Sequence, residues 1–182
     1  MNSMIPTWVG GDLVALDKLE AHQRGLLHKA VSVFVICGDD LLIQQRALGK
    51  YHTPGLWANT CCTHPNWGEA PEHCAQRRLQ EELGISGLML QHRDQVTYRA
   101  DVGSGLIEHE LVDIFVSRVT RRVTVVPNPD EVMETSWVNI DTLSRQTRET
   151  PDLFSPWLTI YLARHKDQIF AQSEDEMVAV PR

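Results

Sequence analysis

The segment 69–83 constrains the fold most, because it reads as one helix with both of its ends marked. Pro71 falls in its first turn, where a missing backbone N–H costs nothing, and Gly84 follows at the position that favours a left-handed C-cap. Its apolar residues, at positions 75, 79 and 83, recur at helical spacing. We therefore expect an amphipathic helix, and the charged residues beside its apolar stripe need partners.

Strand patterns dominate the rest of the chain. Residues 30–37 and 41–45 are apolar or β-branched runs separated by Gly38-Asp39-Asp40, a turn sequence that predicts an antiparallel hairpin. Further strands are expected at residues 56–60, 95–100, 107–119, 122–126 and 135–138. A sheet with few helices indicates an α/β (α+β) fold with a mixed β-sheet.

Two more helices are expected near the ends of the chain. Residues 13–23 carry a short helical pattern, and Ser155 followed by Pro156 predicts the start of a helix that runs to Arg164. No internal repeat or low-complexity linker divides the 182 residues, so a single compact domain is expected. Its expected parts are an N-terminal segment that covers the site (1–29), the domain proper (30–170) and a mobile acidic tail (171–182).

Composition and charge exclude several classes of function. The formal charge of -7 gives no basic footprint for nucleic acid or anionic lipid. The longest apolar run, residues 30–37, is far shorter than the roughly 20 residues that cross a bilayer, and no export signal is evident. The four cysteines form no Cys-x-x-Cys pair and read as reduced thiols. These features predict a cytoplasmic protein that binds neither nucleic acid nor membrane.

Residues 59–65, Asn-Thr-Cys-Cys-Thr-His-Pro, place a thiol and an imidazole just before the 69–83 helix. Packing alone does not require that combination. The alternative to a reactive thiol is a packed one, because free cysteine usually behaves as a small hydrophobe. Composition does not separate Cys61 from Cys62.

A second polar group lies in the expected strand 107–119. Glu108 and Glu110 project from the same side of a strand, and two like charges so placed attract a cation. His22, His28 and His64 would complete a nitrogen and oxygen site for a divalent ion. The alternative is an exposed strand end with solvated carboxylates. The remaining histidines are expected to be ordinary surface or core residues, at positions 52, 73, 92, 109 and 165.

The charges of the 69–83 helix have two interpretations. In one, Arg77–Glu81 and Arg78–Glu82 are surface ion pairs at i,i+4 spacing. In the other, their register resembles the Nudix signature, which is matched by Glu69, Arg77, Leu79, Glu81, Glu82, Gly84 and Ile85. The chain departs from that signature at Thr63, in place of a glycine, and at Arg78, in place of a metal-binding glutamate. The resemblance implies the Nudix fold, a mixed β-sheet sandwiched between helices, whereas Arg78 argues against diphosphate hydrolysis.

Within that superfamily the chain resembles the type I isopentenyl-diphosphate Δ-isomerases over about residues 18–164. The matching segments are Gly-Leu-Leu-His (25–28), Gln-Arg-Ala (45–47), Pro-Gly-Leu-Trp (54–57), residues 59–65 and 77–84, Tyr-Arg-Ala (98–100), Glu-His-Glu (108–110), Asp-Glu-Val (130–132) and Phe-Ser-Pro-Trp (154–157). The resemblance implies an isomerase of isoprenoid biosynthesis that interconverts isopentenyl and dimethylallyl diphosphate. It also implies a small prenyl diphosphate as the partner, and a monomer or weak homodimer is expected.

The resemblance assigns a role to each matching residue. The implied catalytic residues are Cys62, Glu110, Tyr98 and Trp157. The implied ligands of one divalent ion, Mn2+, Zn2+ or Mg2+, are His22, His28, His64, Glu108 and Glu110. A further Mg2+ is implied between the substrate diphosphate, Glu82 and the Cys62 main chain, and the implied diphosphate contacts are Lys18, Arg46, Lys50 and Arg78.

These roles are physically reasonable. Moving a double bond requires adding a proton to one carbon and removing one from another, which Cys62 and Glu110 would do from opposite faces of the substrate, with Tyr98 assisting Glu110. The tertiary cation that develops cannot form hydrogen bonds, so the ring of Trp157 would stabilise it by about 0.5–2 kcal/mol. Arg78 would bind the diphosphate while removing a ligand of the hydrolytic site.

Two alternative functions are open at this point. A Nudix-type diphosphate hydrolase would release phosphate, but it leaves Cys62 and Tyr98 without a role. A non-enzymatic, metal-stabilised binding module would unfold on metal removal, but it has no use for an open thiol beside diphosphate-binding cations. The sequence does not identify the metal, the oligomeric state or the resting protonation of the thiol and carboxylate.

Overall fold

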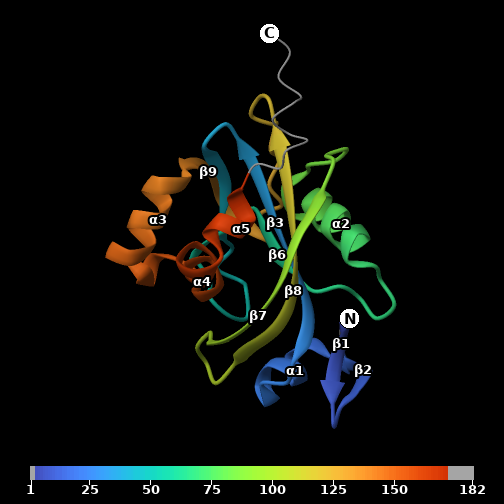
Figure 1. The fold of residues 1–182 in the computed structure, drawn as a ribbon. Helices are drawn as coiled ribbons and strands as arrows, with labels where there is room; N and C mark the ends of the chain where they lie inside the picture. Colours follow the sequence, from blue (N-terminus) through green and yellow to red (C-terminus); the bar gives the residue numbers. More distant parts are fainter. Residues whose placement is uncertain (1–2, 172–182) are drawn as a thin grey trace.

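The computed structural model describes residues 3–171, which form a mixed nine-stranded sheet with helices on both of its faces (Figure 1). The strands are β1 (Met4–Val9), β2 (Asp12–Asp17), β3 (His28–Cys37), β4 (Asp40–Arg46), β5 (Trp57–Ala58), β6 (Cys61–Thr63), β7 (Gln91–Asp101), β8 (Ile107–Val119) and β9 (Val132–Asn139). The helices are α1 (Lys18–Arg24), α2 (Pro71–Leu83), α3 (Ile140–Glu149), the 3-10 turn η1 (Pro151–Leu153), α4 (Pro156–Arg164) and α5 (Lys166–Phe170). No helix in this range is long and apolar enough to cross a membrane.

Strand β3 lies at the centre of the sheet, and this position accounts for its long apolar sequence. It pairs in parallel with β8 and antiparallel with β1, β4 and β6. Its residues 30, 34 and 36 pack with α4, whereas residues 31, 33 and 35 pack with α2. A strand covered on both faces is apolar along most of its length instead of at alternate positions.

The expected helix at 69–83 and the expected hairpin are both present. Helix α2 begins at Pro71, and Gly84 ends it in the left-handed region with φ of 66°. Ala75, Leu79 and Leu83 are buried against β3. Gly38, in the β3–β4 turn, also has a positive φ of 59°. The local signals were sufficient here because caps and turn residues act within a few positions of the element they end.

The N-terminal helix prediction was partly wrong. Residues 12–17 form β2, which pairs antiparallel with β1 from Val9↔Asp12 to Met4↔Asp17. Helix α1 begins only at Lys18, because the Asp17 side chain caps it by accepting a hydrogen bond from the Glu20 N–H (3.1 Å). Pairing with a distant strand overrode the local helical pattern.

The strand expected at 122–126 is absent from the described residues. The backbone N–H of Val126 instead donates to the carbonyl of Leu83 (2.8 Å), and that of Asn128 donates to the carbonyl of Glu82 (2.9 Å). These N–H groups therefore supply hydrogen bonds to two backbone carbonyls at the C-terminal end of α2. An added Cβ at Gly84 would lie 3.0 Å from Val126, which shows how closely the two segments approach.

Helices α3 and α5 were not expected. Asn139 caps the start of α3, where its side chain accepts hydrogen bonds from the Asp141 and Thr142 N–H groups. Ser155 does occupy the N-cap position of α4, but its hydroxyl makes no capping hydrogen bond. The mobile tail expected at 171–182 lies almost wholly outside the described residues.

Candidate active site

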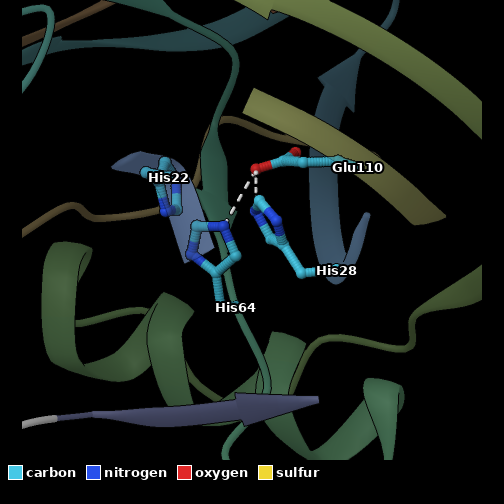
Figure 2. A group of neighbouring side chains, drawn as sticks. All are labelled: His22, His28, His64 and Glu110. Atoms are coloured by element: carbon cyan, nitrogen blue, oxygen red, sulfur yellow. Dashed lines mark hydrogen bonds and ion pairs between the residues drawn. The ribbon is translucent and has the colours of Figure 1, made fainter. Parts of the chain in front are cut away.

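Three histidines and one glutamate converge from four separate elements (Figure 2). His22 lies on α1, His28 begins β3, His64 follows β6 and Glu110 lies in β8. Because β3 and β8 are parallel, His28 stands directly beside Glu110. The Glu110 Oε1 atom is 2.9 Å from His64 Nε2 and 3.5 Å from His28 Nε2. One ligand atom from each of the four residues, hereafter the ligand cluster, lies within 4.8 Å of the others.

Two of the histidines, His22 and His28, are oriented by hydrogen bonds at Nδ1. His22 Nδ1 lies 2.7 Å from the Lys18 carbonyl and His28 Nδ1 lies 2.7 Å from the Leu26 carbonyl. A carbonyl only accepts, so each Nδ1 is the donor, and the neutral form of such a ring has its lone pair on Nε2, which faces the cluster. Burial lowers the pKa of His22 to about 4 and that of His64 to about 3. Neutral imidazoles with directed lone pairs are what a divalent cation binds.

Glu108 lies near this cluster but has different neighbours. Its carboxylate shares the Tyr98 hydroxyl with Glu110, at 2.8 Å and 2.7 Å respectively. Burial and the nearby Glu110 raise the pKa of Glu108 well above its ordinary value. Burial opposes ionisation of Glu110 as well, but its contacts with His28 and His64 hold its pKa low. A phenol has one proton to donate, so a protonated Glu108 that donates to Tyr98, which in turn donates to Glu110, satisfies both short contacts.

His52, which was expected to be an ordinary surface or core histidine, is buried next to this region. It is 5% exposed, and its Nε2 lies 3.6 Å from Glu108 Oε1. His22, His52 and Glu108 form a second group whose ligand atoms lie within 4.8 Å of one another. No spacing rule could have found His52, since the irregular loop between β4 and β5 carries it into the site.

The two adjacent cysteines face opposite sides of the sheet. Cys61 is buried with α2, whereas Cys62 packs toward the α4 side and lines the pocket beside the ligand cluster. The pleat of β6 causes this separation, since neighbouring side chains alternate. The structure thus distinguishes two thiols that the composition could not. None of the four cysteines, all of which lie in the described range, forms a disulfide.

A buried hydroxyl chain holds the Cys62 thiol. The Ser32 hydroxyl donates to Cys62 Sγ (3.2 Å) and lies 3.0 Å from the Tyr161 hydroxyl. If Ser32 donates to sulfur, Tyr161 must donate to Ser32, because a hydroxyl has one proton. Burial raises the pKa of Cys62 well above its ordinary value, so the resting group is a neutral thiol. Neither Ser32 nor Tyr161 had been singled out from the sequence.

Trp157 forms a buried wall of the same pocket. Its indole N–H donates to Asn59 Oδ1 (3.1 Å), which fixes the ring. The Arg46 guanidinium lies over the ring, 5.1 Å from its centroid. The pocket is lined by Lys18, Arg46, Lys50, Tyr51, His52, Cys62, Thr63, His64, Arg78, Glu108, Glu110 and Trp157.

Four basic residues of this pocket form a cationic rim, defined as Lys18, Arg46, Lys50 and Arg78. Two of these cations form ion pairs with Glu131, which contacts Lys50 and lies 3.2 Å from Arg78. Burial opposes ionisation of Glu131, yet these pairs lower its pKa. Burial, together with the neighbouring cations, lowers the pKa of Lys18. Four cationic side chains around one pocket indicate an anion site.

Glu82 is buried beside the rim and does not face the ligand cluster. Its carboxylate accepts hydrogen bonds from Arg78 Nη2 (2.6 Å) and Gln44 Nε2 (2.9 Å). The neighbouring Arg77 instead binds Glu69 through Nε and Nη2 and also reaches Glu81. The i,i+4 pairs expected on α2 are therefore present, but the Arg78–Glu82 pair lies at the pocket and is not a solvated surface pair.

Comparison with known proteins agrees with this architecture. Residues 26–158 match the NUDIX domain family. The isopentenyl-diphosphate Delta-isomerase of Cereibacter sphaeroides strain ATCC 17025 is 62% identical over 172 residues, which cover 94% of this chain and 97% of that protein. The protein of the same name from Roseobacter denitrificans is 60% identical and covers 94% of this chain and 98% of its own length.

Solved structures with low sequence identity share the fold alone. DR0079 from Deinococcus radiodurans is 16% identical, with a TM-score of 0.69 over 88% of this chain and 97% of that one. The MutT protein of Methanosarcina mazei is also 16% identical, with a TM-score of 0.62 over 77% of this chain and 93% of that one. The α/β mixed sheet between helices is thus a Nudix fold.

Proposed function

This chain belongs to the NUDIX family and, within it, to the isopentenyl-diphosphate Delta-isomerases, and on that premise we propose how its residues interconvert isopentenyl and dimethylallyl diphosphate. One observation carries the proposal. A neutral thiol, Cys62, and a buried carboxylate, Glu110, line one pocket whose rim is cationic. An acid, a base and an anion site in one pocket are what a double-bond shift in a diphosphate ester requires.

Cys62 and Glu110 exchange protons with the substrate carbons. One adds a proton to the terminal carbon of the double bond, which creates a tertiary cation, and the other removes a proton from the carbon on the diphosphate side. The proton count of the substrate is unchanged. A thiol whose pKa is raised by burial is protonated at neutral pH, so Cys62 can donate. The hydroxyl chain of Ser32 and Tyr161 then supplies a hydrogen bond to the sulfur that has lost its proton.

Tyr98 links the base to a second carboxyl group. Its hydroxyl bonds to Glu110 and Glu108, so the proton balance of Glu110 depends on both neighbours. Trp157 presents a fixed aromatic surface to the same pocket, where an indole stabilises a carbocation by about 0.5–2 kcal/mol or more. The Arg46 guanidinium lies over that ring, and the carbocation would lie against the part of the ring that lines the pocket.

The cationic rim would hold the diphosphate. Arg78 occupies the position at which the Nudix signature has a metal-binding glutamate, and it pairs with Glu81 and Glu82. A guanidinium there favours binding of the diphosphate over its hydrolysis, since it supplies charge without activating water. Glu82 and the Cys62 main chain would hold a Mg2+ ion that offsets the charge of the substrate diphosphate.

The ligand cluster fits a divalent ion. His28 Nε2 is fully buried and, among residues 3–171, has no hydrogen-bond partner, which is unusual for a polar atom unless another group completes it. His22, His28, His64 and Glu110 would hold the ion, with Glu108 adjacent. A bound ion would fix the orientation and proton affinity of the carboxylate. Three imidazoles and carboxylates accept Mn2+, Zn2+ or Mg2+. We place the protein in the cytoplasm with a small prenyl diphosphate as its substrate.

The adjacent cysteines provide a matched test of the proposal. Cys62→Ala should lower the rate of isomerisation by at least about a hundredfold, the lower range for loss of a general acid or base. Cys61→Ala removes a thiol one residue away that faces the other core, and it should keep near wild-type turnover. Turnover of both substrate isomers is measured on folded protein by NMR. Activity retained in Cys62→Ala, or lost in folded Cys61→Ala, would contradict the assignment.

A further inference from the structure

A fourth histidine faces the metal-binding region. His52 is almost fully buried, and its ring stacks on His22, with ring centroids 5.6 Å apart and 23° between the planes. Its Nε2 atom lies 3.6 Å from Glu108 Oε1, which is too far for a good hydrogen bond and close enough for two ligands of one ion. Ligands about 2.1 Å from a metal ion lie no more than about 4.2 Å apart.

The loop that carries His52 is held in an unfavourable conformation. Thr53 has a φ of 46°, in the left-handed region that a β-branched residue rarely adopts. The Arg46 guanidinium fixes this conformation by donating to the carbonyls of His52 (3.1 Å) and Thr53 (3.2 Å). Backbone strain persists where the surrounding structure enforces it, and it is concentrated at functional sites.

We propose that His52 binds a divalent metal ion together with Glu108 and His22, in a group that shares His22 with the ligand cluster. The inference rests on the proposed function only in that it concerns the same site. His52 would add a second imidazole to the group that holds His22 and Glu108. Because imidazole suits Zn2+ and similar ions whereas Mg2+ prefers oxygen, His52 should raise the affinity for Zn2+ more than the affinity for Mg2+.

The simplest competing explanation is that His52 only packs. Its ring lies against Tyr51 and Trp157, with centroids 4.4 Å and 6.0 Å away, and its Nδ1 lies 3.0 Å from the Thr53 hydroxyl. That contact engages one ring nitrogen and leaves Nε2 directed toward Glu108. Packing therefore accounts for the position of the His52 ring but does not explain why Nε2 points toward Glu108.

The test uses the full-length protein and measures metal binding directly. His52→Phe keeps an aromatic ring between Tyr51 and Trp157 but removes both nitrogens, and His52→Gln is a second variant in case the first does not fold. His73→Gln is the matched control, since His73 is an exposed histidine of α2. The affinities for Zn2+ and Mg2+ are measured by competition with a chromophoric chelator. The number of imidazoles on Zn2+ is counted by X-ray absorption spectroscopy.

We expect both His52 variants to bind Zn2+ at least tenfold more weakly, with one imidazole fewer, and to lose less affinity for Mg2+. The control should remain within twofold of the wild type. Unchanged Zn2+ affinity, or a wild type that binds no Zn2+, would overturn the proposal. Weaker binding with an unchanged imidazole count would also overturn it, because His52 would then only position Glu108. Isomerisation is assayed separately. Its absence would refute the proposed function but would not change the conclusion about metal binding by His52.

Discussion

The ligand cluster and the cationic rim share one pocket but are built in different ways. His22 and His28 are fully buried and are oriented by backbone carbonyls, and Glu110 is 1% exposed. Lys50 and Arg78 of the rim are only partly buried and are paired with the carboxylate of Glu131. The cluster is therefore held in place by the fold, whereas the rim, on the function proposed above, would exchange its acidic partners for the substrate diphosphate. This difference predicts severe effects from changes at the cluster and graded effects from changes at the rim.

Metal removal should have the largest effect. Exhaustive chelation of the purified protein is expected to abolish isomerisation and to lower the midpoint of thermal unfolding, because a bound ion stabilises only the folded state. Readdition of a divalent ion should restore both. The measurement is turnover alongside metal content. Full turnover by protein with less than about one-tenth of an equivalent of metal would show that the cluster is not needed.

Glu110→Gln should be nearly as severe while changing the side-chain volume little. The variant loses the basic oxygen that contacts His28 and His64, and kcat is expected to fall by about 10²–10⁴-fold. Steady-state kinetics at saturating Mg2+ measures the loss. His73→Gln, on the exposed face of α2, serves as the control and should be near wild type. If Glu110→Gln turned over within tenfold of the wild type, Glu110 would not be an acid or base of the reaction.

The stability of the metal-free protein should decrease as the pH is lowered. The pKa values of His22 and His64 are lowered to about 4 and about 3, and that of His52 is also lowered, so the unfolded chain binds protons that the folded chain refuses. Stability is thus present above about pH 6.5 and is lost toward pH 4, by about 1.4 kcal/mol per pH unit for each net proton.

Glu108 acts in the opposite direction, because its raised pKa makes the folded chain bind a proton that the unfolded chain releases. Three imidazoles contribute more to the pH dependence than one carboxyl group does, so the free energy of unfolding should still decrease as the pH is lowered. Urea unfolding in the presence of a chelator measures it. A free energy of unfolding that is flat or rises from pH 6.5 to 4.5 would mean that the histidines are not held neutral.

Arg78→Lys tests the rim and should have a smaller effect. Lysine keeps the charge but cannot reach Glu81, Glu82 and Glu131 together or bind a diphosphate through two N–H groups. We expect KM to rise about tenfold, equivalent to about 1.4 kcal/mol, while kcat stays within about threefold. Arg145→Lys, an exposed pair partner of Glu149, is the matched control. A loss confined to kcat would place Arg78 in the chemical step instead of in binding.

The sequence predicted the elements that local signals determine, and it failed where contacts between distant segments determine the structure. Helix α2, the β3–β4 hairpin and the full extent of β8 were predicted because caps, turns and strand periodicity are local signals. The segment 12–17 was misassigned because β1 pairs with it, and the 122–126 segment because it binds the end of α2. Interactions between distant segments leave no local pattern.

The expected site residues converge on one region of the fold, but their arrangement needed the structure. The pleat of β6 separates Cys61 from Cys62, and the loop held by Arg46 brings in His52. Glu108, which was expected with His22, His28, His64 and Glu110, shares a group of possible ligands with His22 and His52. The assigned roles of these residues remain predictions that the variants above can test.

The most direct test of the account is the fate of solvent deuterium. The protein is incubated with isopentenyl diphosphate and Mg2+ in D2O, and the alkene protons and free phosphate are followed by NMR. The account predicts dimethylallyl diphosphate that carries deuterium in a methyl group, with no phosphate released, because an exchangeable group such as the Cys62 thiol delivers the proton. Phosphate release without isomerisation, or product free of solvent deuterium, would contradict it.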